Sequence, residues 1–233
     1  MNDVRVRALI QYFLEHPENV SQVVEFDKDA DQLFPFDFTL ANTRLTPETY
    51  ADTAGFSKWI RRTISKNKCR YGIGGYGEHR VIYSRRELFD KEEEPRRLHL
   101  GVDIWGPEGT AVFSPVDGTV HSYRYNDNFG DYGATLILAH EINGVKFHSL
   151  YGHLNLAGIT DKERGTTIHR GEKIAEFGHI SENGHWPPHL HFQLIFDMQG
   201  MEGDYPGVCR YSERDSYLNN CPDPDIILKH TFG

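Results

Sequence analysis

Residues 185–194 read HWPPHLHFQL and bring three histidines and two prolines into ten positions. The proline pair ends any helix and favours extended chain, so the residues from 189 onward are predicted to form a strand with side chains on alternating faces. One face is apolar and suits a core: Leu190, Phe192, Leu194 and Phe196. The other face carries His189, His191, Gln193 and Ile195. Packing does not require two neighbouring imidazoles, so these two are candidates for chemistry.

A second polar pattern lies in the stretch HLGVD, where His99 and Asp103 stand four residues apart. Gly101 and the β-branched Val102 disfavour a helix, and four residues of straight extended chain would separate the two side chains by ~13 Å. The two side chains can therefore converge only if the chain bends near Gly101. A further histidine, His153, follows a β-prone run and a glycine in SLYGHLNL.

This set of residue types points to zinc. Catalytic zinc sites use three nitrogen or oxygen ligands from the protein and leave the fourth tetrahedral position to water. Two histidines and one aspartate would supply the three ligands. Two more histidines would remain near the metal, available to accept a proton from the water and to stabilise the oxyanion that forms.

The order and spacing of these residues resemble a known family. HLGVD followed much later by HLHF is similar to the His-x-x-x-Asp and His-x-His pattern of the M23 zinc metallopeptidases of the lysostaphin and LytM type. The resemblance covers roughly residues 97–197 and includes PVDGTVHS, YGHL and GHISENGHWPPHLHF. It implies that His99, Asp103 and His191 ligate Zn²⁺ and that His153 and His189 are the catalytic pair. A spacing of ~7 Å along a strand between His189 and His191 agrees with this division.

The family also implies a fold and an activity. The implied fold is mainly β, an antiparallel sheet or β-sandwich-like peptidase domain built on a duplicated hybrid motif, with a groove over the metal. The implied activity is zinc-dependent endopeptidase cleavage of peptide bonds, often beside glycine, in peptides of the peptidoglycan type. The family acts mostly outside the cytoplasm. The long N-terminal part and the CPDPDIIL tail lie outside a minimal peptidase, so the chain resembles M23 modules found in multidomain chains.

Four segments are expected along the chain. Residues 1–68 read as a small helical and irregular extension, and residues 69–96 as a Gly-rich hairpin and connector. Residues 97–200 read as short strands between turns, with Asn143-Gly144 as the strongest hairpin signal, and form the expected peptidase domain. Residues 201–233 are rich in turn formers and are expected to be an irregular extension.

The composition limits the classes of partner that the protein is expected to bind. The formal net charge is −9 over 233 residues, and basic residues cluster only around Arg61 to Arg70, so neither nucleic acid nor a membrane is expected as a partner. The N-terminus lacks the pattern of a signal peptide, so a cytoplasmic location is expected. The three cysteines have no C-x-x-C spacing, which disfavours a thiolate zinc site and favours reduced thiols. A bridge between Cys209 and Cys221 stays open.

Two other functions are compatible with parts of this pattern. A non-catalytic zinc module could use the same pocket to bind a peptide, but it would have no need of His153 and His189. A phosphocarrier of the sugar-phosphotransfer type could use paired histidines, but it would not need Asp103.

Further residues are weaker candidates for the site. We hypothesise that residues 70–86 cover the groove and place a side chain in the fourth zinc position. Gln193 could orient a ligand, and His185 and Trp186 could line the groove. The candidates for an additional oxyanion donor are Tyr83, Tyr123 and Tyr151.

Overall fold

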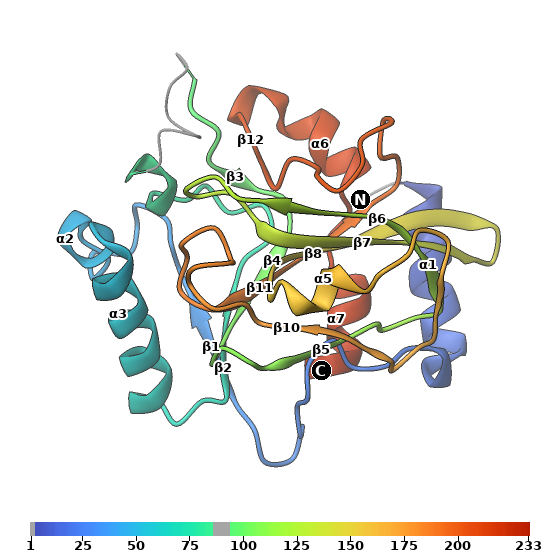
Figure 1. Ribbon diagram of the computed structural model, residues 1–233, viewed down its shortest axis with the longest axis horizontal. Coiled ribbons are helices and arrows are strands. Elements are labelled where there is room, and N and C mark those ends of the chain that lie inside the picture. The colour runs from blue at the N-terminus through green and yellow to red at the C-terminus, as the bar shows by residue number, and fades with distance from the viewer. Residues whose placement is uncertain (1–2, 86–93) are drawn as a thin grey trace.

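A large sheet forms the centre of the chain (Figure 1). The computed structural model describes residues 3–85 and 94–233, and within them this sheet has eight strands. In spatial order they are β1 (Leu33–Phe36), β2 (Tyr71–Gly74), β4 (Val102–Trp105), β11 (His189–Ile195), β8 (Val145–Leu154), β7 (Gly133–Ile142), β6 (Gly118–Asn126) and β9 (Thr167–Ile168). Strand β1 runs parallel to β2, and the other neighbours are antiparallel. The predicted mainly β fold is confirmed, with a mixed sheet.

Two short strand pairs accompany the large sheet. Strand β5 (Ala111–Phe113) pairs with β10 (Lys173–Glu176), and β3 (Leu98–His99) pairs with β12 (Val208–Cys209). The first pair contributes Val112 and Ile174 to the main core, together with residues of β7 and β8. The second pair contributes to a separate core that includes Ile137 and Leu150, whose side chains lie on the other face of the sheet. The large sheet is therefore buried on both faces.

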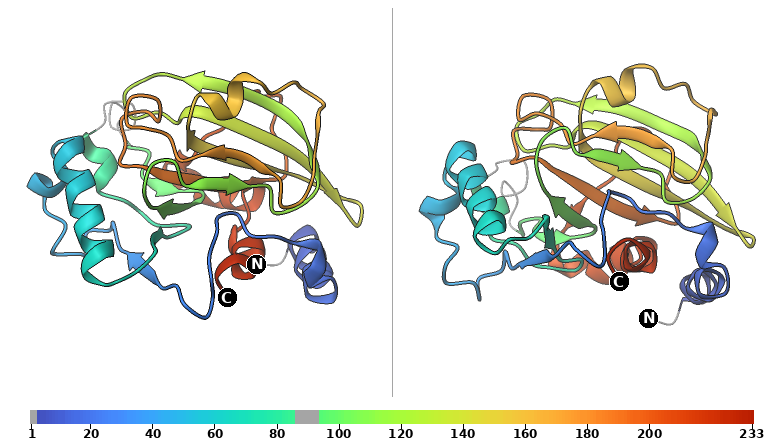
Figure 2. Two further views of the ribbon diagram at one scale, coloured as in Figure 1. Left: turned by 60° about the horizontal axis from the view of Figure 1, so that its bottom comes forward. Right: turned by 90° about the horizontal axis from the view of Figure 1, so that it is seen from below.

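The helices lie around the edges and faces of the sheet. They are α1 (Val4–Glu15), α2 (Pro47–Tyr50), α3 (Thr53–Lys66), α5 (Ala157–Thr160), α6 (Arg214–Asn220) and α7 (Asp225–Phe232), with 3-10 turns η1 (Pro17–Asn19), η2 (Ile82–Arg85) and η3 (Tyr211–Glu213). Helices α1 and α7 lie near each other on one side of the sheet, and α2 and α3 lie at the end that carries β1 and β2 (Figure 2). None of the helices in the described ranges combines the length and the apolar character needed to span a bilayer.

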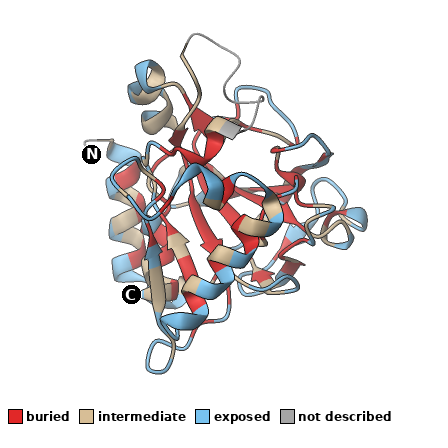
Figure 3. Cartoon of the chain, turned by 90° about the vertical axis from the view of Figure 1, so that its left-hand side faces the viewer, coloured by how far each residue is buried: buried red, intermediate tan, exposed pale blue. Residues whose placement is uncertain are grey.

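Strand β11 sits in the interior of the sheet, between β4 and β8. All seven of its residues are buried, and Figure 3 shows buried residues running along the strands while much of the helices and loops is more exposed. As the sequence predicts, Leu190, Phe192 and Leu194 enter the main core. The alternating face, with His189 and His191, is therefore the one left for the site.

The predicted hairpin between β7 and β8 is present. Its two turn residues, Asn143 and Gly144, have φ values of +49° and +75°. A two-residue turn with positive φ at both positions matches the twist of the strands it joins, which explains the Asn-Gly sequence. This hairpin holds β8 in register with β7 and so places the end of β8, where His153 lies.

The N-terminal part is built into the sheet and does not form a separate extension. Strand β2 does not form a hairpin within residues 69–96, because it pairs with β1 on one side and with β4 on the other. An aromatic cluster links this part to the loop before β11: Phe36, Phe38, Phe56, Trp105 and Trp186. The rest of the expected connector, residues 86–93, lies outside the described residues.

The C-terminal residues also differ from the irregular extension that the sequence predicts. They form α6 and α7, and Ile227 of α7 is fully buried in the main core. Turn-forming residues here mark the breaks between short elements, while the apolar run IIL supplies the buried face of a helix. Cys209 and Cys221 are both buried and both free thiols.

Candidate metal centre

Three candidate ligand side chains converge from three strands. His99 ends β3, Asp103 lies in β4, and His191 lies opposite Asp103 in β11. His99 Nε2 is 2.9 Å from His191 Nδ1 and 3.2 Å from Asp103 Oδ1, and His191 Nδ1 is 3.1 Å from the same oxygen. Tetrahedral ligands bound at 2.0–2.1 Å lie about 3.3 Å apart, so the three atoms are spaced to share one metal ion.

The bend that the sequence requires is present at Gly101. Strand β3 ends at His99 and β4 begins at Val102, so the chain changes direction between them. A Cβ atom on Gly101 would lie 2.7 Å from the His191 ring and 2.7 Å from the carbonyl oxygen of Phe192. Glycine is therefore needed here because the backbone passes directly against a candidate ligand.

Hydrogen bonds fix which nitrogen of each candidate ligand is free. His99 Nδ1 donates to the carbonyl oxygen of Gly75 at 3.0 Å, and His191 Nε2 donates to Gln193 Oε1 at 2.9 Å. The amide of Gln193 is held in this orientation because its Nε2 donates to the carbonyl oxygen of Pro206. The other nitrogen of each ring carries a lone pair directed at Asp103 Oδ1, so three acceptors converge with no donor between them, as a cation requires.

The protonation states suit metal binding at neutral pH. Burial lowers the pKa of His99 to about 4, and the nearby Arg80 charge acts in the same direction. Burial alone would raise the pKa of Asp103, but the nearby charge of Arg80 holds it well below 3.8. The imidazole is neutral and the carboxylate ionised, which are the forms that bind metals.

His153 and His189 form a stacked pair beside this group. Their ring centroids are 4.1 Å apart, and His189 also stacks on Trp105 at 3.9 Å. His153 Nδ1 donates to the carbonyl oxygen of Asn183 at 2.8 Å, and His189 Nδ1 donates to that of Pro187 at 2.7 Å. Each ring therefore keeps an Nε2 lone pair, and His189 Nε2 lies 4.0 Å from Asp103 Oδ1.

Both rings of the pair are held neutral. Burial lowers the pKa of His189 to about 4 and lowers the pKa of His153 well below 6.5. The backbone of His153 has a φ of +63°, in the left-handed region that a histidine rarely adopts. Such strain is concentrated at functional sites, where the surrounding structure holds the residue in place.

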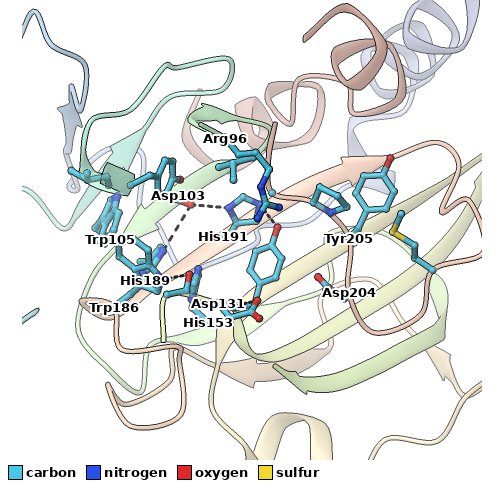
Figure 4. A pocket seen from close by; sticks show the side chains of 18 residues that line it. Arg96, Asp103, Trp105, Asp131, His153, Trp186, His189, His191, Asp204 and Tyr205 are labelled. Carbon is cyan, nitrogen blue, oxygen red and sulfur yellow. Dashed lines mark hydrogen bonds and ion pairs between the residues drawn. The ribbon is translucent and has the colours of Figure 1, made fainter. Parts of the chain in front are cut away.

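Four of these five side chains line one cavity of about 230 Å³ (Figure 4). Asp103 and His191 line it together with His153 and His189. Its remaining lining residues are Ile82, Tyr83, Arg96, Trp105, Gly130, Asp131, Tyr132, Trp186, Met201, Asp204, Tyr205, Pro206, Gly207 and Val208. Neutral bases, a candidate metal group and aromatic walls therefore share one enclosure, as is common in ligand-binding sites.

The weaker candidates from the sequence lie in different places. Gln193 contacts His191 as expected, Trp186 lines the cavity, and its indole nitrogen donates to the carbonyl oxygen of Gly130. Tyr83 also lines the cavity. Three candidates lie elsewhere: the His185 ring lies against Phe129, Tyr123 is 41% exposed, and the Tyr151 hydroxyl accepts a hydrogen bond from Ser149 within the core.

Two residues of the site have no signal in the sequence pattern. The hydroxyl of Tyr132 lies 3.5 Å from His191 Nε2, and Gly207 leaves room for it, because a Cβ there would lie 2.0 Å from that oxygen. Arg80 is fully buried and contacts Asp103 Oδ2. A guanidinium has no lone pair to offer a metal. In the described part of segment 70–86, the side chain that reaches the candidate ligands is thus a cation and not the fourth ligand that we hypothesised.

Comparison with known proteins identifies the domain that carries this site. Residues 97–202 match the model of Peptidase family M23. This part of the chain belongs to peptidase family M23. The family predicted from the sequence is therefore confirmed, and the four histidines and the aspartate of the site all lie in the M23 domain.

Relatives of this M23 domain bear peptidase names. An "Uncharacterized metalloprotease" of Haemophilus influenzae is 34% identical over 140 residues, which are 57% of this chain and 27% of that protein. The "DD-carboxypeptidase/endopeptidase Mpg" of Neisseria meningitidis is 28% identical over 131 residues, 54% of this chain and 28% of that protein. The chain thus spans about a quarter of the length of these relatives.

A solved structure was also matched. The catalytic domain of lysostaphin from Staphylococcus simulans is 22% identical, with a TM-score of 0.43, and the match covers 74% of this chain and 97% of that one.

Proposed function

We propose that this protein is a zinc-dependent metalloendopeptidase that hydrolyses peptide bonds. The observation that carries the proposal is the convergence of three lone-pair acceptors, on His99, Asp103 and His191. Two neutral histidines lie beside them and line the same cavity as Asp103 and His191. Membership of the M23 family and the metalloprotease and endopeptidase names of relatives support it. A module that only binds peptides would gain nothing from the stacked pair of His153 and His189.

Zinc is the metal that best fits the donor set. Two imidazole nitrogens and one carboxylate oxygen, with no thiolate, form a common ligand set of catalytic zinc, whereas calcium and magnesium prefer oxygen ligands alone. Bound zinc would polarise the scissile carbonyl and lower the pKa of a water molecule to about 7. His99, Asp103 and His191 would hold it.

The stacked histidines are proposed to move the proton. The Nε2 atoms of His153 and His189 carry lone pairs, since each Nδ1 donates to a backbone carbonyl oxygen. One Nε2 would accept a proton from the attacking water and then donate it to the nitrogen of the leaving amine. The other Nε2 would accept a hydrogen bond from the same water and orient it for the attack. The two carbonyl partners keep both rings turned toward the cavity.

The substrate that we propose is a peptide with small residues, such as glycine, beside the cleaved bond, or a peptide of the peptidoglycan type. Trp105, Trp186 and Tyr83 form bulky walls next to the reacting groups, which favours small side chains there. The name DD-carboxypeptidase/endopeptidase, borne by a relative, is consistent with a peptide from peptidoglycan.

A cleavage assay tests the proposal. The purified chain, loaded with zinc, is incubated with glycine-rich peptides and with peptides that contain D-amino acids, and new amino termini are measured. We expect cleavage of at least one peptide, its loss on treatment with a chelator, and its return when zinc is added back. Stoichiometric zinc binding without cleavage of any peptide would contradict the endopeptidase and favour the non-catalytic zinc module.

A further inference from the structure

A short segment before the M23 domain runs alongside the first candidate ligand. The backbone nitrogen of Gly77 donates to the carbonyl oxygen of His99 at 2.8 Å, and the nitrogen of His99 donates to that of Glu78 at 2.9 Å. The nitrogen of Arg80 donates to the carbonyl oxygen of Arg97 at 2.9 Å. Residues 75–80, which we call the bracing segment, therefore pair with residues 97–99 although they lie outside the range 97–202 that matches the family.

The bracing segment contacts two of the three candidate ligands through polar groups. The carbonyl oxygen of Gly75 accepts the Nδ1 hydrogen of His99, which leaves His99 Nε2 free. Arg80 Nη1 donates to Asp103 Oδ2 at 2.5 Å. Because Arg80 engages Oδ2, the other oxygen of Asp103 is the one that faces His99 and His191.

Burial and polar contacts hold the Arg80 side chain in place. Its side chain is fully buried, its Nε donates to Glu78 Oε2 at 2.7 Å, and its Nη1 lies 3.2 Å from the hydroxyl of Tyr83. Glu78 is tied down in turn, because its Oε1 accepts the backbone hydrogen of Phe38 at 2.9 Å. A buried guanidinium between two carboxylates has little freedom to rotate, so it dictates the rotamer of Asp103.

We propose that Arg80 is a positioning residue of the metal centre, which holds Asp103 so that Oδ1 alone is presented to the ion. The bracing segment is then part of the functional site, and the M23 domain depends on the N-terminal part of the chain for the order of its ligands. This inference rests on the proposed metal site but not on peptide cleavage. Groups that orient metal ligands commonly change metal affinity by about 10- to 100-fold.

Two substitutions at Arg80 test this role in the full chain. Arg80→Lys keeps the positive charge but loses the planar fork that reaches both Glu78 and Asp103. Glu78→Gln combined with Arg80→Met removes opposite charges together, so that Glu78 is not left as a carboxylate without its partner. Arg164→Lys is the matched control, because Arg164 makes an exposed ion pair with Glu202 far from any candidate ligand in sequence.

The measurements are the dissociation constant of zinc, by competition with a chromophoric chelator, and the absorption spectrum of the Co²⁺-substituted protein. We expect about 10- to 100-fold weaker zinc binding in both Arg80 variants. We also expect a changed Co²⁺ spectrum, since a freed Asp103 can bind through both oxygens, and no change in Arg164→Lys. The Co²⁺ spectrum reports the geometry of the ligands, so it would stay unchanged if Arg80 only stabilised the fold.

One set of results would overturn the proposed role of Arg80. Suppose that either Arg80 variant unfolds cooperatively on heating, has a zinc dissociation constant within twofold of the wild type and keeps the wild-type Co²⁺ spectrum. In that case Arg80 does not position Asp103. Peptide cleavage does not enter this comparison, so wild-type protein that binds zinc without cleaving peptides would overturn the proposed function and leave the role of Arg80 intact.

Discussion

At the scale of single residues, the site separates the proposed metal ligands from the histidines that we propose to move a proton. Every histidine in it donates one ring hydrogen to a fixed oxygen: Gly75 for His99, Gln193 for His191, and backbone carbonyls for the other two. The remaining nitrogen of each ring is therefore an acceptor, and its position decides its use. The nitrogens of His99 and His191 meet Asp103 Oδ1, while those of His153 and His189 remain available to a substrate.

This division gives a prediction for His189. Replacement of His189 by Ala removes a proposed proton acceptor but no candidate ligand, so we expect a 10²- to 10⁴-fold lower kcat with zinc content unchanged. The measurement is peptide cleavage together with metal analysis of the same sample. His169→Ala is the control, because the side chain of His169 is 78% exposed. Cleavage by His189→Ala at the wild-type rate would exclude His189 from proton transfer.

The sequence reveals some of these residues and conceals others for a physical reason. The HLGVD and HLHF stretches are visible because residue type, spacing and strand alternation all constrain them locally. Gly101 could be assigned to a bend, but the His191 ring that forbids a side chain there comes from another strand. Arg80 and Tyr132 carry no such spacing, because they reach the site through contacts between segments far apart in the chain.

At the scale of elements, strands β7 and β8 bury a polar group next to the main core. His140 is 4% exposed, its Nδ1 donates to the carbonyl oxygen of Asp117, and its Nε2 lies 2.7 Å from the Ser149 hydroxyl. Burial lowers the pKa of His140 from 6.5 to about 4. Burial thus favours the neutral ring, because a protonated ring would place a charge inside the sheet.

The lowered pKa predicts a pH dependence of stability. The unfolded chain binds a proton at His140 below pH 6.5 and the folded chain only near pH 4, so this stability is present above pH 6.5 and is lost as the pH falls toward 4. Between pH 7 and pH 5 the loss is about 2 kcal/mol. We expect denaturant unfolding of His140→Gln to show a pH dependence smaller by that amount, with His169→Gln unchanged. An equal pH dependence in His140→Gln and the wild type would contradict this.

Elements fixed by local sequence were predicted and those fixed by distant partners were not. Strand β11 follows from its alternating faces, and the hairpin at Asn143 and Gly144 follows from its turn chemistry. Strand β2 was expected in a hairpin of its own. Its actual neighbours, β1 and β4, lie many residues away along the chain in either direction. The Gly-rich sequence itself contains no signal that identifies them as partners.

At the scale of the whole molecule, the two ends of the chain complete the core beneath the sheet. Leu9 and Phe13 of α1 share the main core with Ile227 of α7, and the ring of Phe13 lies 5.8 Å from that of His230. The backbone nitrogen of Val23 donates to the Thr231 hydroxyl at 3.1 Å. The extensions that flank the M23 domain are therefore part of one packed structure with it.

This packing predicts that a change at the C-terminus weakens the whole fold. Ile227→Ala removes a fully buried side chain and should lower the free energy of unfolding by about 3 kcal/mol and the Tm by about 6–12 °C. The matched control is Leu14→Ala, because Leu14 lies on α1 but is 62% exposed. Calorimetry measures both. An independent, irregular tail would leave the Tm of Ile227→Ala within the error of the control.

The central claim is that His99, Asp103 and His191 hold one catalytic zinc ion. Elemental mass spectrometry of the wild type, His191→Ala and the control His169→Ala, each purified with zinc and freed of excess metal, tests it most directly. The account predicts close to one zinc per chain in the wild type and in His169→Ala, and its loss in a folded His191→Ala. A wild-type protein that retains no zinc, or a His191→Ala variant that retains it fully, would contradict the account.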